Sequence, residues 1–291
     1  VVARDDRTRR TLVSESATSA LAASASTSAT TSAHGGAFRG VILAGGSGSR
    51  LDPLTRAGVN KHLLPVGRKP MIWHAIDKMR AAGVRRVMIV TGTEHAGGLF
   101  QSLRAGAEFD CEFTYRVQEQ AGGIAEALLL ARDFIDGDPS CVILGDNVFE
   151  DPLGPLLDRF YDEVFVQGRG PRGRVVLKEV EDARRFGVAA LDTEGYIAHI
   201  VEKPADPPSN LAVTGIYMYA GGRALFDLIG DLRPSGRGEL EITDLHGLLL
   251  ARGALTHDRL EGWWTDCGTH ETLERASALL RGEVTRGEVT P

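Results

Sequence analysis

Short apolar runs, separated by stretches with helical spacing, constrain the fold of this chain more than any other feature. They lie at residues 41–44, 87–90, 113–117 and 141–144 of the 291-residue sequence. Continuous apolar runs of this length are typical of strands that are buried on both faces of a parallel sheet. The series predicts successive βαβ units with right-handed crossovers, and therefore a Rossmann-like α/β domain in three layers.

Helical and shorter β patterns complete this outline. Pro70 opens a predicted helix that extends to Ala82. From about residue 172 to residue 220 the pattern changes to shorter β runs separated by turns. Three further helices are predicted near residues 224–229, 242–251 and 269–280. The second half of the chain should therefore add β elements to the sheet that the first half begins.

The first predicted strand ends in a glycine-dense loop, with the sequence GVILAGGSGSRL at residues 40–51. Glycines let the backbone approach a ligand closely, and successive free N–H groups form a cradle for an anion. Arg50 adds a positive charge that can bind a phosphate at two points. The segment therefore predicts phosphate binding at the end of the first strand, against the alternative of an ordinary loop with a solvated arginine.

Two common glycine motifs do not fit this loop. A P-loop requires a lysine after its last glycine, and none follows Gly48. The dinucleotide fingerprint requires a third glycine where this chain has Leu51, which argues against an NAD-dependent dehydrogenase. Lys61 follows shortly downstream and adds a second positive charge.

Polar side chains also end two other predicted strands. Asp146 follows the run at 141–144, at the sheet edge where parallel sheets bind ligands, and a carboxylate there suits Mg²⁺. An Asp-Asn pair is also common in turns, so this signal depends on the phosphate loop beside it. Gln118 ends another strand, and its amide offers the donor and the acceptor needed to recognise a pyrimidine base. Gly123 would let backbone groups approach that base.

Two segments resemble a known family. They are LAGGSGSRL at residues 43–51 and NKHLLPV at residues 60–66. Both are similar to the sugar-1-phosphate nucleotidylyltransferases, and most of all to the short form of the glucose-1-phosphate thymidylyltransferases. The resemblance extends from Phe38 to about Leu280. It implies a GT-A-like αβα nucleotidyltransferase fold, with a mainly parallel central sheet and added β elements on the sugar side.

The resemblance also implies roles for individual residues. The implied catalytic residues are Arg50, Lys61, Asp146 and Asp266. The implied nucleotide-binding residues are Leu43, Ala44, Gly45, Gly46, Gly48, Gln118, Gly123 and Asp146. The implied sugar-phosphate-binding residues are Gly187, Glu202, Lys203, Thr214, Arg237 and Trp264. Mg²⁺ is the implied cofactor, with Asp146 and Asp266 as its ligands.

Some positions depart from the family or carry no assigned role. The family commonly has prolines between Gln118 and Gly123, whereas this chain has Glu-Gln-Ala at residues 119–121, so the base preference stays open. Trp264 has simple core packing as an alternative to a wall for the sugar. The Arg184–Arg185 pair is interpreted as solvated, and neither Cys267 nor His270 is given a chemical role.

The implied reaction joins a nucleoside triphosphate to a hexose 1-phosphate. The segments at residues 60–62, 202–204 and 238–244 favour dTTP and glucose 1-phosphate. A sugar-phosphate oxygen attacks the α-phosphorus in line, giving dTDP-glucose and pyrophosphate without a covalent enzyme intermediate. A UTP- or CTP-dependent enzyme and a metal-dependent glycosyltransferase of similar architecture are the alternatives. A catalytically inactive regulatory subunit is disfavoured, because all four charged catalytic positions are intact.

Composition limits the partners. The net charge of −6 argues against nucleic acid, and three widely spaced cysteines fit a reducing cytoplasm. No apolar run approaches the roughly 20 residues that a membrane helix needs. We therefore expect a cytoplasmic enzyme with small phosphorylated substrates. A homodimer is favoured over a tetramer, because few residues follow Leu280 to form the tetramer and feedback surface of the long family members.

The two ends of the chain differ from its centre. Residues 16–33 are almost entirely Ser, Thr and Ala, which offers too little apolar bulk to offset the entropy of ordering. We predict that residues 1–37 are a disordered extension without a chemical role and that residues 283–291 form a flexible tail. Residues 38–282 then form one domain, with a nucleotide half over about 38–150 and a sugar half over about 151–282.

Overall fold

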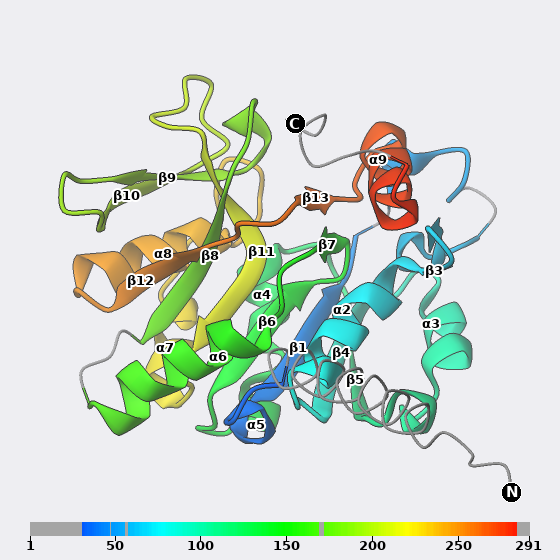
Figure 1. Cartoon of the computed structure of the whole chain (residues 1–291), viewed down its shortest axis with the longest axis horizontal. Coiled ribbons are helices and arrows are strands. Elements are labelled where there is room, and N and C mark those ends of the chain that lie inside the picture. Colours follow the sequence, from blue (N-terminus) through cyan, green and yellow to red (C-terminus); the bar gives the residue numbers. More distant parts are fainter. Residues whose placement is uncertain (1–30, 47, 56–57, 169–171, 284–291) are drawn as a thin grey trace, which may run out of the picture.

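The computed structural model describes residues 31–46, 48–55, 58–168 and 172–283. A nine-stranded mixed sheet forms its centre, with helices on both faces (Figure 1). The mainly parallel α/β fold predicted from the sequence is confirmed. Predictions for residues 1–30 and 284–291 fall outside the described residues.

The strands of the large sheet are β1 (Arg39–Ala44), β4 (Arg86–Gly92), β5 (Glu112–Gln118), β6 (Ser140–Leu144), β8 (Gly173–Glu179), β9 (Gly187–Leu191), β10 (Ile197–Glu202), β11 (Leu211–Tyr219) and β12 (Leu255–Arg259). Four short strands form two separate pairs, β2 (Pro65–Val66) with β3 (Lys69–Pro70) and β7 (Asn147–Phe149) with β13 (Trp264–Asp266).

The α-helices are α2 (Met71–Ala81), α3 (Ala96–Leu103), α4 (Ile124–Leu129), α5 (Arg132–Ile135), α6 (Gly154–Tyr161), α7 (Arg223–Gly230), α8 (Ile242–Ala251) and α9 (His270–Arg281). Short 3₁₀ turns are η1 (Gly35–Ala37), η2 (Ser49–Leu51), η3 (Lys61–Leu63), η4 (Ala107–Phe109) and η6 (Ala183–Arg185), and a π turn, η5 (Asp162–Val166), extends α6. Among these described helices, none is long and apolar enough to cross a membrane.

Strands β5, β4, β1 and β6 form the parallel part of the sheet in that order. Ile42 of β1 is in register with Ile89 of β4 on one side and with Ile143 of β6 on the other. Beyond β6, strand β11 runs antiparallel and carries β8 with β12 on one path and β9 with β10 on another. These are the added β elements that the sequence predicted.

Alternation along β1 explains the three layers. Side chains of a strand point to opposite faces in turn. Ile42 packs in one buried cluster, together with residues of α2 and α6. Its neighbours Val41 and Leu43 pack in a second cluster, together with residues of α4, α7 and α8. Because both faces of β1 are covered, its sequence reads as a continuous apolar run.

The domain begins earlier than the predicted boundary at residue 38. Ser32 is buried, and its Oγ donates a hydrogen bond of 2.6 Å to Asp158 of α6. The ring of His34 stacks on Tyr161 at 4.1 Å between centroids. Residues 32–37 therefore pack against α6, and the part of the proposed extension that the structure describes belongs to the folded domain.

Candidate active site

The fold brings the predicted site residues from distant parts of the chain to one edge of the sheet. The glycine loop follows β1, Gln118 is the last residue of β5, and Asp146 lies just after β6. In a parallel sheet these carboxyl ends lie together, and ligands bind there. Asp266 joins them from β13, which pairs antiparallel with β7 and places Asp266 in register with Asn147.

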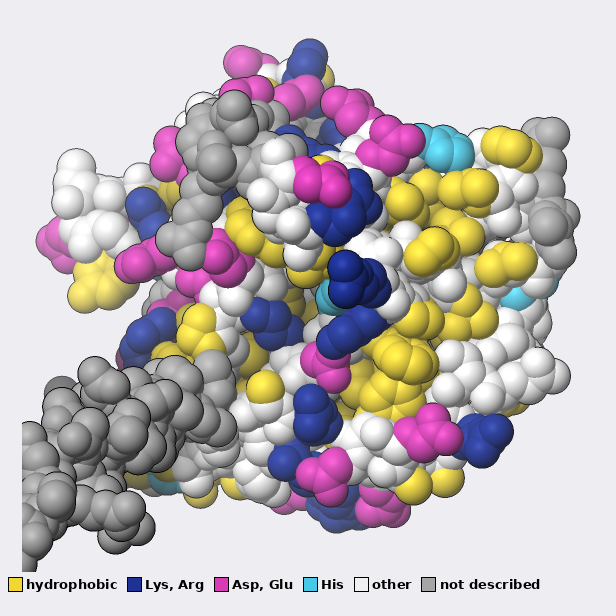
Figure 2. All heavy atoms as spheres, turned by 45° about the vertical axis from the view of Figure 1, so that its right-hand side comes forward, with side chains coloured by type: hydrophobic (Ala, Val, Ile, Leu, Met, Phe, Trp, Pro, Cys, Tyr) yellow, Lys and Arg dark blue, Asp and Glu magenta, His cyan; other side chains and the backbone are white. Residues whose placement is uncertain are grey.

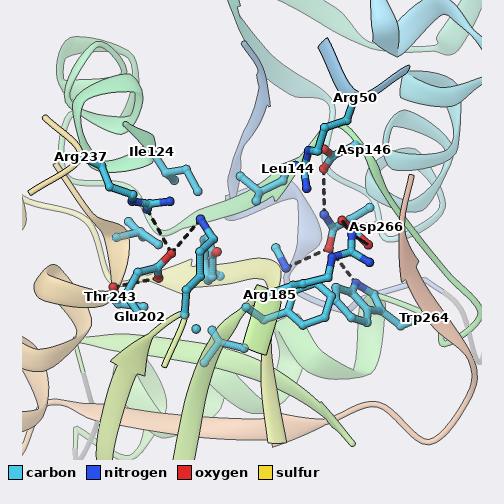
Figure 3. Close-up of a pocket in the computed structure, with 18 residues that line it drawn as sticks. Arg50, Ile124, Leu144, Asp146, Arg185, Glu202, Arg237, Thr243, Trp264 and Asp266 are labelled. Carbon is cyan, nitrogen blue, oxygen red and sulfur yellow. Dashed lines mark hydrogen bonds and ion pairs between the residues drawn. The ribbon is translucent and has the colours of Figure 1, made fainter. Parts of the chain in front are cut away.

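Two cavities meet at this edge. The loop cavity, of about 310 Å³, is lined by the glycine loop and by Gln118. The tryptophan cavity, of about 410 Å³, is lined by Trp264 and by residues of β9, β10 and α8. Both are lined by Arg50, Asp146, Leu144 and Ile124, so they share one wall. Figure 3 shows the tryptophan cavity, with Arg50, Asp146 and Asp266 on one side and Arg237 and Glu202 on the other.

Most of the predicted nucleotide-binding residues line the loop cavity, namely Leu43, Gly45, Gly46, Gln118, Gly123 and Asp146. Ala44 lines a smaller adjoining pocket with Gly46 and Gln118. Gly48 is not part of the cavity lining and packs closely against Lys61. Its φ is +66°, and a Cβ there would lie 2.9 Å from the Cβ of Lys61, so a larger residue would displace that lysine.

Lys61 and Asp146 form an ion pair at the wall that the cavities share. Lys61 Nζ donates to Asp146 Oδ2 at 2.7 Å, and the side-chain amide of Asn147 donates to the other carboxylate oxygen at 3.0 Å. Burial opposes ionisation of Asp146, but the charge of Lys61 and these hydrogen bonds hold its pKa well below the usual range. Asp146 is therefore a permanently ionised group.

The neighbouring imidazole of His62 is neutral. Its ring is 1% exposed, and Nδ1 lies 2.9 Å from Asn60 Oδ1. Burial, reinforced by the charge of Lys61, lowers the pKa of His62 to about 3. Lys61 is consequently the cationic partner of Asp146 at neutral pH, and His62 fills the space behind the carboxylate without adding charge.

Asp266 behaves in the opposite way to Asp146. Burial and the negative charge of Asp146 raise the pKa of Asp266 to about 6, against the positive charges of Arg185 and Arg50. Arg185 Nη2 lies 3.1 Å from Asp266 Oδ2. Arg184 and Arg185 are both exposed, as the sequence-based interpretation predicted, but that interpretation missed the contact of Arg185 with Asp266. Arg184 pairs with Asp182 on the surface.

The donor set fits Mg²⁺. The negative charge of Asp146 opposes ionisation of Asp266, and a cation bound by both carboxylates would offset that repulsion. No group of three or more His, Cys, Asp or Glu side chains that could hold a metal occurs in the described residues. Mg²⁺ commonly takes only one or two protein carboxylates and completes its coordination with water and substrate phosphates. Asp146 and Asp266 are thus suitable ligands for a metal that arrives with a nucleotide.

Carboxylates and cations alternate across the tryptophan cavity. Glu202 Oε1 lies 3.1 Å from Lys203 Nζ and 3.3 Å from Arg237 Nη2, and its Oε2 accepts a hydrogen bond from Thr243. Glu241 accepts hydrogen bonds from the same Arg237 Nη2 at 2.7 Å and from Arg237 Nε at 3.1 Å. The two cations are therefore aimed at the cavity by carboxylates, and they remain partly exposed, so that an incoming phosphate can reach them.

Two of the predicted sugar-binding residues need comment. Thr214 is fully buried and donates its hydroxyl to the carbonyl of Val176 at 2.8 Å, so that hydroxyl does not face the tryptophan cavity. The structure thus contradicts its assignment as a sugar-hydroxyl ligand. Trp264 does line the cavity, beside Gly187, and its Nε1 donates to Asn147 Oδ1 at 2.7 Å.

Sequence reasoning missed Asn147, which connects the site to its surroundings. Its Oδ1 accepts from Trp264 and from the backbone N–H of Gly215, and its amide donates to Asp146. Asn147 belonged to the Gly-Asp-Asn triplet, which was a usable signal. Arg185 had no local signal, because its partner lies far along the chain.

These features define the class of protein. The sequence model of the nucleotidyl transferase family matches residues 39–283 of this chain. The chain therefore belongs to the nucleotidyl transferase family and is a nucleotidyltransferase.

Relatives within the family share much of the chain. A glucose-1-phosphate thymidylyltransferase of Xanthomonas campestris pv. campestris is 44% identical over 83% of this chain and 80% of its own length. A glucose-1-phosphate thymidylyltransferase of Neisseria meningitidis is 38% identical over 84% of this chain and 83% of its own.

Solved structures agree. A Bacillus anthracis protein, assigned as a glucose-1-phosphate thymidylyltransferase and crystallised with sucrose, is 48% identical with a TM-score of 0.77, covering 85% of this chain and 96% of its own. A UDP-glucose pyrophosphorylase complexed with UDP-glucose is 26% identical with a TM-score of 0.72, covering 85% of this chain and 99% of its own.

Proposed function

We propose that this nucleotidyltransferase joins dTTP to glucose 1-phosphate, giving dTDP-glucose and pyrophosphate. The observation that carries the proposal is the wall that the two cavities share, where Arg50 and Asp146 lie between the glycine loop and the cations Lys203 and Arg237. Lys61 of the loop cavity pairs with Asp146 at this wall. The names of the relatives at 44% and 38% identity support this choice of base and sugar.

Positioning and charge neutralisation do the catalytic work. The difficulty of the reaction is to bring two polyanions together, since the attacking phosphate oxygen needs no further activation. Arg50 and the N–H groups of the loop hold the triphosphate and the departing pyrophosphate. Lys203 and Arg237 hold the phosphate of the sugar. Lys61 leaves Asp146 for the phosphates and bridges the attacking phosphate and the α-phosphate with its positive charge.

Asp146 and Asp266 are the proposed ligands of Mg²⁺. When bound, the metal supplies positive charge to the phosphate oxygens as negative charge builds up on them. Glu202 has a separate task, because its carboxylate both orients the two cations and accepts hydrogen bonds from sugar hydroxyls. Gly187 lies within the same lining, where a missing side chain leaves its backbone accessible to the sugar.

A pyrophosphate-release panel tests the proposal. Purified protein is incubated with Mg²⁺, each of dTTP, UTP, CTP, ATP and GTP, and each of several hexose 1-phosphates. Release that is fastest with dTTP and glucose 1-phosphate supports the proposal. Fastest release with UTP would assign the enzyme to the activity named for the UDP-glucose pyrophosphorylase. Consumption of a nucleotide-sugar without pyrophosphate would instead indicate a glycosyltransferase.

Self-association and location complete the proposal. Figure 2 shows apolar side chains gathered on the face that carries α3 and α9, and Phe100 of α3 and Leu280 of α9 are among the large exposed hydrophobic residues. Apolar surface of this kind favours a homodimer, which sedimentation would detect. The three cysteines are free thiols, which supports a reducing cytoplasm.

A further inference from the structure

The amide group of Gln118 has a defined orientation at the wall of the loop cavity. Its Nε2 lies 2.6 Å from Glu126 Oε2 and 3.2 Å from the carbonyl oxygen of Gly123. A carbonyl oxygen only accepts hydrogen bonds, and so does the carboxylate of a glutamate at neutral pH. The atom that contacts both must therefore be the NH₂ nitrogen of Gln118, and the oxygen of the amide has to point the other way.

The space around this pair is kept free by two glycines. A Cβ on Gly45 would lie 3.3 Å from Gln118 Oε1, so the amide oxygen faces the backbone of the glycine loop. A Cβ on Gly122 would lie 2.1 Å from Glu126 Oε2, which is far inside contact distance. Any side chain at position 122 would therefore push the Glu126 carboxylate away from Gln118.

We propose that Glu126 determines the base specificity of this enzyme by fixing the amide of Gln118. The inference rests on the proposed function, because it requires the base of the triphosphate to occupy the loop cavity beside Gln118. With the amide nitrogen held by Glu126, the oxygen that remains can pair with the ring N–H of a base, and it repels a base whose ring nitrogen at that position carries a lone pair. Glu126 does not touch the base and is a positioning residue.

Bases divide into two groups on this criterion. Thymine and uracil carry a ring N–H at N3, and guanine carries one at N1. Cytosine and adenine have a lone pair at the corresponding nitrogen, which would face the lone pairs of the Gln118 oxygen. A site built around a buried polar group rejects the ligand that cannot pair with it by up to about 10⁴-fold. The structure therefore predicts acceptance of dTTP and UTP and rejection of CTP.

The chemistry of position 126 is what makes the orientation fixed. A glutamine there can donate or accept, so the pair could form with either orientation of the Gln118 amide. In the variant Glu126→Gln, the Gln118 amide could turn and donate its NH₂ to the ring nitrogen of cytosine without losing its hydrogen bond to residue 126. Uracil and thymine would still find the oxygen, because the original orientation remains available.

The experiment compares nucleotides that differ only in the base. kcat/KM is measured for dTTP against dCTP, and for UTP against CTP, with glucose 1-phosphate, in the wild type, Glu126→Gln and Gly122→Ala. Glu108→Gln is the matched control, since it removes the same charge from an exposed residue that pairs with Arg104 on the surface. Binding of dTTP and dCTP without sugar phosphate is measured by calorimetry as a second readout.

We expect both site variants to lower the ratio of kcat/KM for dTTP to kcat/KM for dCTP by at least about tenfold. This factor is the equivalent of one hydrogen bond of roughly 1.4 kcal/mol. The gain should come mainly from better use of dCTP, which a loss of folding would not produce. Glu108→Gln should keep the wild-type ratio.

An unchanged ratio in both site variants overturns the inference, while the proposed function survives on pyrophosphate release with dTTP. A wild type that prefers CTP overturns the inference and the choice of dTTP together. If the wild type releases no pyrophosphate with any nucleotide, the proposed function fails, and the calorimetric ratio alone decides the role of Glu126.

Discussion

The two carboxylates Asp146 and Asp266, which both line the tryptophan cavity, differ in their tendency to ionise. Asp146 is paired with Lys61 at 2.7 Å and is ionised, whereas Asp266 is raised to a pKa of about 6 by burial and by Asp146. This asymmetry follows from the partner that each one has, since both are aspartates at the end of a short buried strand. A cation bound by both carboxylates would favour ionisation of Asp266 and so give both side chains the same charge.

Replacing either carboxylate by its amide should reduce turnover steeply. Asp146→Asn and Asp266→Asn each remove a negative charge from the proposed metal site, and we expect kcat to fall by roughly 10²-fold or more at saturating Mg²⁺. Asp133→Asn, on the exposed surface of α5, should leave kcat unchanged. Near-normal turnover in either site variant would show that it is not a metal ligand.

Arg185 should matter although its neighbour Arg184 does not. Arg185→Met removes a charged hydrogen bond to Asp266, and because the arginine is 40% exposed the cost is moderated by solvent. We expect kcat/KM to fall about tenfold. Arg184→Met is the matched control, and it should keep the wild-type kcat/KM in steady-state assays. Equal effects of the two variants would show that Arg185 has no role at the site.

Most of the predicted site residues do line the two cavities, and their signals in the sequence were local. The glycine loop, Lys61 and Asp146 each end or follow a predicted element. The assignment of Thr214 and the pairing of Arg185 could not be predicted, for a different reason. Thr214 sits on a strand whose register decides which way the hydroxyl points, and Arg185 pairs with a residue 81 positions away. Neither register nor long-range pairing is written in a short motif.

At the scale of elements, the pair formed by β7 and β13 is what completes the active site. Only three residues of each strand pair, and the side chain of Asn147 adds the bonds that join this ladder to β11 and to Asp146. The pattern around Trp264 gave no indication of a strand, because a three-residue strand is too short to show periodicity.

Removing the Asn147 side chain should weaken the whole domain as well as the site. Asn147→Ala leaves the buried N–H groups of Trp264 and Gly215 without their acceptor, at a cost of about 2–4 kcal/mol in the free energy of unfolding. Urea unfolding measures this loss. Asn210→Ala, at an exposed position, should change stability by less than about 0.5 kcal/mol.

The segment that packs on α6 can be tested without touching the site. Asp158 accepts hydrogen bonds from Ser32 Oγ and from the backbone N–H groups of Ala33 and His34. Asp158→Ala should lower Tm by about 2–4 °C, as expected for a loss near 1 kcal/mol in a domain of this size. kcat should remain at the wild-type value; a fall in kcat would connect this segment to catalysis.

For the molecule as a whole, the sequence predicted the layers of the fold better than the residue at which the domain begins. The buried runs placed β1, β4, β5 and β6 in a parallel sheet, because strands covered on both faces are apolar throughout. The start of the domain was predicted too late. Ser32 and His34 lie in a segment of small polar residues, and they are held by hydrogen bonds and ring stacking that leave no apolar pattern.

Stability should fall in mild acid. His246 is fully buried between Tyr217 and Tyr219, and burial lowers its pKa to about 3. Below pH 6.5 the unfolded chain binds a proton that the folded protein refuses, so stability is lost as pH falls from 6.5 towards 3, by up to about 1.4 kcal/mol per pH unit.

Urea unfolding at pH 7 and pH 5 measures this dependence. His246→Gln should flatten it, and the exposed His199→Gln should not. An unchanged slope in His246→Gln would assign the acid sensitivity to other groups, of which His62 is the first candidate.

The pairing of β13 with β7 has a consequence for the time at which activity can arise. Asp146 and Asp266 are 120 positions apart, and the second reaches the first only when its strand has added to a ladder formed by residues made much earlier. A chain emerging from the ribosome can assemble the parallel strands β1, β4, β5 and β6 and the glycine loop while Asp266 is still inside the exit tunnel. The nascent protein therefore holds its glycine loop before it holds both carboxylates, and the proposed role of Asp266 delays turnover until β13 has left the tunnel.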